Sequence, residues 1–262
     1  MKHTLMVFIL LLVGCGGGGS SGSGSDSSEF IPLERSSEIQ SQYASGSRPV
    51  IRILCLGSSV GAGAGLTDTN DTPVAYFTRK LIEAGYDAQF TNLSVNGSVV
   101  TDGAKLFPSL TAHYDIVLIV YGMNDGMPYQ YHSGQIFNGF KKQVDALAMA
   151  IYQRGADPVF ITTPHPHTQR AEWIMPPNPQ IAWSGPDYIC SPCYSIRHKN
   201  INDYLRSSPY PVIDAEKYWL DAVEMFGEDY LFDDGEIKHP NLTGHQLSFW
   251  LAIDEWLGTH FD

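Results

Sequence analysis

Apolar residues along this chain fall into short continuous runs, separated by longer stretches with helical spacing. The short runs predict strands at residues 50–56, 88–95, 115–121, 158–162 and 211–214, of which 50–56 and 115–121 are apolar enough to be buried. The longer stretches predict helices at residues 72–84, 101–112, 133–154, 195–206, 215–226 and 242–259. Strands that alternate with helices are typical of a three-layer α/β/α sandwich with a mainly parallel central sheet, whose functional sites lie at the carboxyl ends of the strands.

The first residues of the chain depart from this alternation. Residues 1–14 begin with one lysine and continue in an apolar run that is shorter than the roughly 20 residues of a permanent membrane span, which is typical of a signal peptide. The run ends in Leu-Val-Gly-Cys15, which resembles a bacterial lipobox, the signal for cleavage before the cysteine and lipidation of its thiol. The alternative is an ordinary secretory signal with an incidental cysteine.

Residues 16–28 are almost wholly glycine and serine, a composition that predicts a flexible tether. We expect residues 15–47 to form this tether and a lead-in, and the globular body to begin at about Glu29 or Arg48. Residues 48–262 are long enough for one domain with a sizeable core. Since Gly16 rather than aspartate follows Cys15, the lipobox analogy implies an exported protein anchored to the outer membrane, on its periplasmic or cell-surface face.

The charge of the chain excludes some partners. Its formal net charge is −12, and no stretch of the sequence concentrates lysine and arginine. Such a chain is a poor ligand for nucleic acid and for anionic lipid headgroups. Membrane attachment is therefore expected only through Cys15.

The first predicted strand ends in a turn that suits a nucleophile. Gly57 breaks the apolar run and delivers Ser58 and Ser59 into a glycine-rich loop. A serine at the carboxyl end of a parallel strand is presented at the rim of the sheet, and the glycines free the N–H of Ser59 to face a developing oxyanion. Gly/Ser turns are also common without any catalytic role, so Ser59 needs partners elsewhere in the chain.

Three further turns offer those partners. Gly97 follows the second predicted strand, Asn124 follows the third, and His239 lies among acids directly before the last helix. Acyl transfer requires a nucleophile, a base, a carboxylate that orients the base, and oxyanion donors, and this set supplies each role. Each residue has an ordinary alternative as a turn or cap residue.

Together these turns resemble the four sequence blocks of the SGNH (GDSL-type) hydrolase family, over residues 48–261. Gly57-Ser58-Ser59 is similar to the first block, Gly97 and Asn124 to the second and third, and His239 to the histidine of the last block, Asp-x-x-His. The resemblance implies a flavodoxin-like sandwich, a Ser59–His239 esterase, and an oxyanion hole formed by Ser59, Gly97 and Asn124. It implies a mechanism without metal or organic cofactor.

Two positions depart from the family pattern. Ser58 replaces the aspartate of the first block, a change we expect to be tolerated because that aspartate is not the triad acid. Glu236 stands three residues before His239, where the family has aspartate. We rank Glu236 first as the orienting acid, Asp234 or Asp233 second, and a Ser-His dyad third.

The substrate is indicated by a long irregular segment, residues 163–193, which contains Trp173 and Trp183 among several prolines. These aromatic side chains suit stacking against sugar rings, or packing of the loop on the body. We favour a short-acyl (O-acetyl) ester of a carbohydrate as the substrate. A lipase, lysophospholipase or thioesterase, or a catalytically inactive carbohydrate-binding domain, are the alternatives.

The remaining cysteines and histidines are expected to be structural. Cys190 and Cys193 predict a small disulfide in an oxidising compartment, with zinc bound together with His198 or His165 as the less favoured alternative. Cys55 lies inside the first strand and predicts a buried thiol. The other histidines singled out are His165, His167 and His245, of which the first two are placed to line the pocket.

Overall fold

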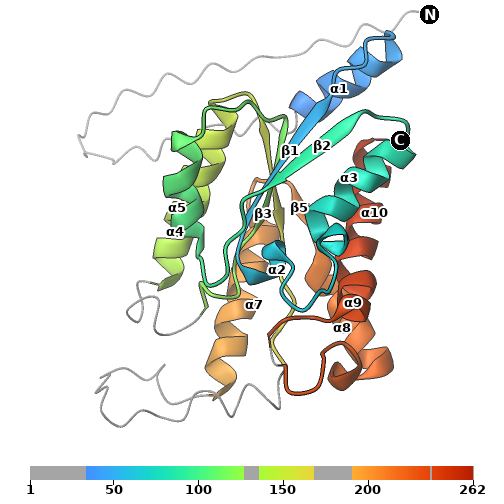
Figure 1. Ribbon diagram of the computed structural model, residues 1–262. Coiled ribbons are helices and arrows are strands. Elements are labelled where there is room, and N and C mark those ends of the chain that lie inside the picture. The colour runs from blue at the N-terminus through green and yellow to red at the C-terminus, as the bar shows by residue number, and fades with distance from the viewer. Residues whose placement is uncertain (1–33, 127–135, 168–190, 237, 262) are drawn as a thin grey trace, which may run out of the picture.

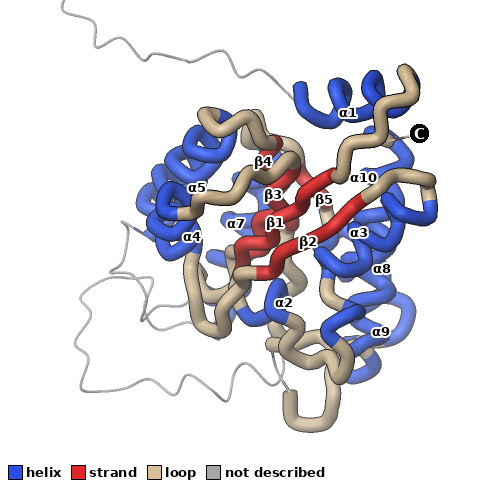
Figure 2. The backbone as a smooth tube through the Cα atoms, turned by 45° about the horizontal axis from the view of Figure 1, so that its top comes forward, coloured by secondary structure: helices blue, strands red, loops and turns tan. Residues whose placement is uncertain are grey.

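A computed structural model describes residues 34–126, 136–167, 191–236 and 238–261. Five strands in these ranges form one parallel sheet in the order β2-β1-β3-β4-β5 (Figures 1 and 2). The strands are β1 (Ile51–Gly57), β2 (Ala88–Asn92), β3 (Ile116–Val120), β4 (Asp157–Ile161) and β5 (Val212–Ile213). This order is that of the flavodoxin-like sandwich, so the predicted fold class is confirmed.

The six predicted helices are present, and α1 and α2 occur in addition to them. They are α1 (Glu34–Ala44), α2 (Ser59–Ala62), α3 (Pro73–Glu83), α4 (Val100–Leu106), α5 (Ile136–Tyr152), α7 (Ser191–Ser207), α8 (Ala215–Phe226), α9 (Leu242–His245) and α10 (Leu251–His260). A π-turn at Gln246–Trp250 joins α9 to α10, so the predicted last helix is nearly continuous. Pro108 lies in a 3₁₀ turn, Phe107–Ser109, which ends α4 earlier than predicted because proline donates no helical hydrogen bond.

The sheet is covered on both faces. Along β1, Ile53 and Cys55 face a core with α3, α8 and α10, whereas Leu54 and Leu56 face a second core with α4, α5 and α7 (Figure 1). Both sets are fully buried, which is why β1 is a continuous apolar run rather than an alternating one. The Cys55 thiol is buried as predicted, and burial raises its pKa to about 12.

Helix α1 lies in the region predicted as a tether and lead-in, and it is part of the folded domain. Arg35 Nη2 donates to Asp115 Oδ1 at 2.6 Å, Ser36 Oγ donates to Asp157 Oδ2 at 3.0 Å, and Ile39 is buried in the α3 core. Helix α1 therefore belongs to the folded body, whose expected start was about Glu29 or Arg48. The sequence gives little sign of this helix because polar contacts to buried carboxylates, rather than an apolar stripe, hold most of it.

Several predictions concern residues outside those the structure describes. They are the signal peptide and the lipidation site at Cys15, the glycine and serine tether at 16–28, Trp173 and Trp183, and the side chains of Cys190 and Cys193. Within the described ranges, no helix is both long and apolar enough to cross a membrane.

Candidate active site

The predicted nucleophile lies where the first strand meets a short helix. β1 ends at Gly57 and α2 begins at Ser59, so the Ser59 N–H stands at the first position of a helix and has no acceptor within it. Gly57 is required by close approach to β3: a Cβ atom there would lie 2.9 Å from the Val120 carbonyl oxygen. Ser59 is buried, and the exposed fraction of the residue is 6%.

The turns that carry the predicted oxyanion donors are joined directly to this nucleophile turn. Ser98 Oγ donates to the Gly57 carbonyl at 2.8 Å, and Asn124 Nδ2 donates to the Ser98 carbonyl at 3.0 Å. Since a side-chain amide has two N–H groups, Asn124 retains one for a ligand. Gly97 adopts a φ of +80°, a conformation that favours glycine and orients the turn. The structure thus links the turns of Gly97 and Asn124 to Gly57, two residues before Ser59.

The predicted base and its first-ranked acid are in contact. His239 Nδ1 lies 3.2 Å from Glu236 Oε2, and the other carboxylate oxygen accepts the backbone N–H of Lys238 at 2.9 Å. Asp233 and Asp234 are exposed. The contact supports Glu236 as the residue that orients the imidazole, and this role remains a prediction.

A glycine that the sequence analysis did not single out connects His239 to the nucleophile. Gly65, in the loop after α2, has a φ of +87°, and a Cβ atom there would lie 2.3 Å from the Pro240 carbonyl oxygen and 3.2 Å from His239 Cβ. The loop after Ser59 therefore packs against the backbone of the His239 turn. Among the described residues no hydrogen bond joins the Ser59 side chain to His239, a contact that often tightens only when substrate binds.

The Asp125 side chain holds the turn that carries Asn124. Its side chain is fully buried, Oδ1 accepts the N–H of Val100 at 3.0 Å, and Oδ2 accepts the N–H of Gly122 at 3.0 Å. It therefore ties the start of α4 to the turn after β3. Burial raises the pKa of Asp125 to about 7, against the opposing effect of these two backbone donors. The sequence showed the Asn-Asp pair but not this role.

A pocket of about 340 Å³ opens beside Gly97. It lies between the turn after β2 and helix α4, and Gly97 is the predicted oxyanion donor that lines it. Its lining residues are Leu93, Val95, Asn96, Gly97, Ser98, Asp102, Leu106 and Tyr121. The pocket is small and mixed in polarity, and neither His165 nor His167 lines it.

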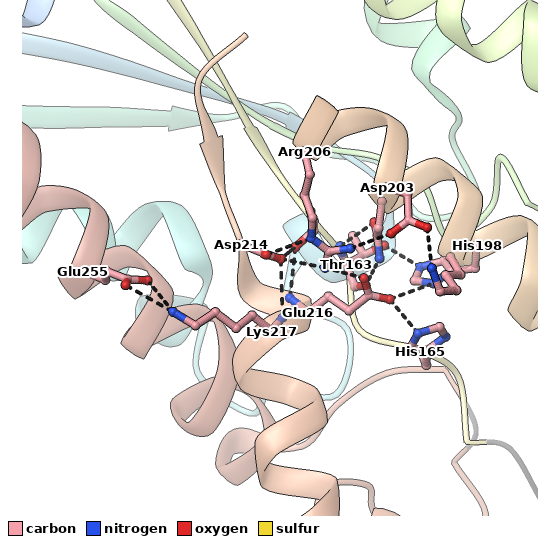
Figure 3. Close-up of polar contacts among 12 residues, drawn as sticks. Thr163, His165, His198, Asp203, Arg206, Asp214, Glu216, Lys217 and Glu255 are labelled. Atoms are coloured by element: carbon pink, nitrogen blue, oxygen red, sulfur yellow. Dashed lines mark hydrogen bonds and ion pairs between the residues drawn. The ribbon is translucent and has the colours of Figure 1, made fainter. Parts of the chain in front are cut away.

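A second hydroxyl–imidazole–carboxylate cluster lies at the ends of β4 and β5. Thr163 Oγ1 is 2.7 Å from His198 Nε2, and His198 Nδ1 is 4.0 Å from Glu216 Oε1 (Figure 3). Thr163 and His198 are both fully buried. An ester cannot reach this hydroxyl, so the cluster is not the catalytic triad.

Each of the three histidines expected to be structural either contacts a carboxylate or is buried. His165 Nε2 lies 2.5 Å from Glu216 Oε1, and His167 Nε2 lies 2.9 Å from Asp229 Oδ1. His245 is fully buried and stacks on Phe249, and burial lowers its pKa to about 3. None of the three contacts Ser59 within the described residues.

Comparison with known proteins places this chain among ester hydrolases. Residues 55–247 match the GDSL-like Lipase/Acylhydrolase family. The sequence is similar to esterase TesA of Pseudomonas aeruginosa, with 35% identity over 77 residues, a match that spans 29% of this chain and 38% of TesA.

Solved structures with the same fold include three esterases. The crystal structure of TesA has a TM-score of 0.56 at 19% identity, over 80% of this chain and 99% of TesA. A two-domain esterase (CEX) active on acetylated mannans has a TM-score of 0.57 at 14% identity, over 86% of this chain and 52% of the esterase. Axe2, an acetylxylan esterase from Geobacillus stearothermophilus, was solved as a catalytic mutant; its TM-score is 0.54 at 15% identity, over 79% and 94% of the two chains.

The contact between Gly65 and the His239 turn generates a prediction. Gly65→Ala should displace His239 from Ser59 and lower kcat for ester hydrolysis by about 10- to 100-fold, because misplacing a catalytic group by about 1 Å has effects of that size. Gly85→Ala is the matched control, since Gly85 has a φ of +92° but no atom within 4 Å of an added Cβ. Equal kcat values for the two variants would show that Gly65 does not position His239.

The buried carboxyl of Asp125 generates a second prediction. Because its folded-state pKa of about 7 exceeds the ordinary 3.8, its stabilising contribution is present below about pH 4 and is lost as pH rises through 7. Urea unfolding from pH 4 to pH 8 should show a larger loss of stability in the parent chain than in Asp125→Asn, which stays neutral. Parallel curves for the two proteins would contradict a raised pKa at Asp125.

Proposed function

The chain belongs to the GDSL-like lipase/acylhydrolase family of carboxylic ester hydrolases, and we propose that it is a serine esterase for short acyl groups, O-acetyl groups on carbohydrate above all. In this proposal Ser59 is the nucleophile, His239 the base and Glu236 the orienting acid. The backbone N–H groups of Ser59 and Gly97 and the side-chain amide of Asn124 form the oxyanion hole.

The observation that carries the proposal is the chain of contacts among the four motif turns. Ser98 binds the Gly57 carbonyl, Asn124 binds the Ser98 carbonyl, and the loop of Gly65 packs on His239. These turns are far apart in sequence, and no packing requirement of the sheet explains why each offers a group suited to acyl transfer.

The proposed reaction proceeds in two displacements. The imidazole of His239 takes the proton of Ser59 as Oγ attacks the ester carbonyl, and the oxyanion of the tetrahedral intermediate accepts the three N–H donors. Glu236 holds Nδ1 and stabilises the imidazolium. His239 then protonates the leaving alcohol, and water, deprotonated by the same imidazole, cleaves the acyl-enzyme and restores Ser59.

Two features support a short acyl group on carbohydrate. The pocket beside Gly97 has a volume of about 340 Å³, near the small end of ligand pockets, and Asp102 and Tyr121 in its lining are polar. Proteins with this fold include the esterase active on acetylated mannans and the acetylxylan esterase. A lipase or thioesterase would require a longer apolar channel, and an inactive binding domain would not require the triad.

We expect hydrolysis of p-nitrophenyl acetate to exceed that of the butyrate, octanoate and palmitate esters, and acetate to be released from acetylated xylan or mannan. Ser59→Ala should lower kcat by about 10⁴-fold or more, and Asn124→Ala by about 10²- to 10³-fold. Ser58→Ala is the matched control, because the buried Ser58 Oγ has no hydrogen-bond partner among the described residues and its loss should leave activity unchanged.

Two other experimental outcomes would favour one of the alternative functions. A preference for palmitate would favour the lipase or thioesterase. A folded protein that binds polysaccharide but cleaves no ester, with Ser59→Ala binding equally well, would favour the inactive domain.

The proposal also includes export and lipid anchoring through Cys15, so that the esterase acts at the outer membrane on a glycine and serine tether. In a bacterial host, the full chain should incorporate labelled palmitate, and Cys15→Ala should not. Unlabelled protein of full mature length would favour the ordinary secretory signal instead.

A further inference from the structure

The cluster around Glu216 gathers metal-binding side chains from three segments that are distant in sequence. His165 follows β4, His198 lies on α7, and Glu216 lies in the first turn of α8. Figure 3 shows both imidazoles directed at the same end of the Glu216 carboxylate, with Arg206 at the other end. We propose that His165, His198 and Glu216 bind one divalent transition-metal ion of the zinc type.

The spacing of the ligand atoms suits such an ion. One nitrogen of each imidazole and one carboxylate oxygen all lie within 4.8 Å of one another. In tetrahedral zinc sites, with bonds of roughly 2.0–2.1 Å, neighbouring ligand atoms are about 3.3 Å apart. The 2.5 Å from His165 Nε2 to Glu216 Oε1 and the 4.0 Å from His198 Nδ1 to Glu216 Oε1 lie on either side of this value. Shifts of less than about 1 Å would therefore complete the site.

A second layer of contacts orients two of the ligands. Thr163 Oγ1 lies 2.7 Å from His198 Nε2, which directs Nδ1 toward Glu216. The Thr163 backbone is itself held by Asn202, whose side-chain amide donates to the Thr163 carbonyl at 2.9 Å. Arg206 Nη2 donates to Glu216 Oε2 at 2.5 Å and so turns Oε1 toward the histidines. Metal-ligating histidines and carboxylates commonly have such outer partners.

The local charge also favours a cation. Arg206 contributes one positive charge, whereas Glu216 and Asp214, which both bind it, contribute two negative charges.

The site is separate from the proposed catalytic residues but borders them. A Cβ atom on Gly122 would lie 3.3 Å from Thr163 Oγ1, so the Asn124 turn packs on the outer partner of His198. The His165 side chain keeps an exposed fraction of 15%, whereas those of His198 and Glu216 are buried. An ion would enter past His165 and would link the loop after β4 to α7 and α8. The ion would therefore stabilise the fold, independently of ester hydrolysis.

The test uses the full chain after EDTA treatment and desalting. Zinc is titrated into this protein, its binding is measured by isothermal titration calorimetry, and the bound zinc is quantified by metal analysis. We expect one Zn²⁺ per chain and a Tm that rises with zinc concentration. His165→Ala, at the partly exposed ligand, should weaken binding by about 100-fold or more and abolish the Tm shift. Thr163→Val, which changes only a positioning residue, should weaken binding by about 10-fold or more.

Two controls separate this site from others. His113→Ala removes an exposed histidine that lies beside Asp115 and should keep full zinc affinity. The double variant Cys190→Ser/Cys193→Ser should keep it as well, since the site requires neither cysteine. Absence of stoichiometric binding, full affinity in folded His165→Ala, or loss of affinity in the double cysteine variant would each overturn the proposal. Circular dichroism of each variant verifies folding.

Discussion

The close approach of β1 and β3 at their carboxyl ends is the constraint on which the rest of the site depends. Gly57 is paired with Val120, the Ser58 N–H donates to the Val120 carbonyl at 3.0 Å, and no Cβ fits at Gly57. In this strand order the two strands flank the point where the chain reverses its direction of sheet growth, and ligands bind in the crevice formed there. A larger residue at Gly57 would separate the nucleophile turn from the strand that leads to Asn124.

The sequence predicted the elements that local pattern controls and missed those that depend on distant contacts. Continuous apolar runs located β1 and β3 because burial on both faces leaves few polar positions, whereas the edge strand β2 is largely exposed. Helix α1 was missed because Asp115 and Asp157, which bind it, lie far along the chain. The motif residues of the site were accessible because each lies in a turn at the end of a predicted element: Ser59, Gly97 and Asn124 after strands, and His239 before the last helix. Gly65 and Glu216 were not, because their partners are evident only in three dimensions.

Burial by itself does not decide the state of a carboxylate, as Asp125 and Glu216 demonstrate. Both side chains are almost fully buried. Burial raises the pKa of Asp125 to about 7, and the Asp102 carboxylate adds to this rise against the opposing effect of backbone N–H donors. Burial would also raise the pKa of Glu216, but its hydrogen bond to His165, with Asn202 and His198, lowers that pKa to about 2. Side-chain partners therefore offset desolvation at Glu216, whereas backbone donors do not at Asp125.

Both carboxylates lie near the turn after β3. Asp125 accepts the Gly122 N–H directly, and Glu216 lies 4.0 Å from His198, whose partner Thr163 has its hydroxyl close to Gly122. The backbone that presents Asn124 is therefore held by the buried carboxyl of Asp125 and packs on Thr163, which belongs to the Glu216 cluster. Because an oxyanion donor is effective only when its position is fixed before the reaction, the rigidity of this turn depends on buried polar residues that never contact the substrate.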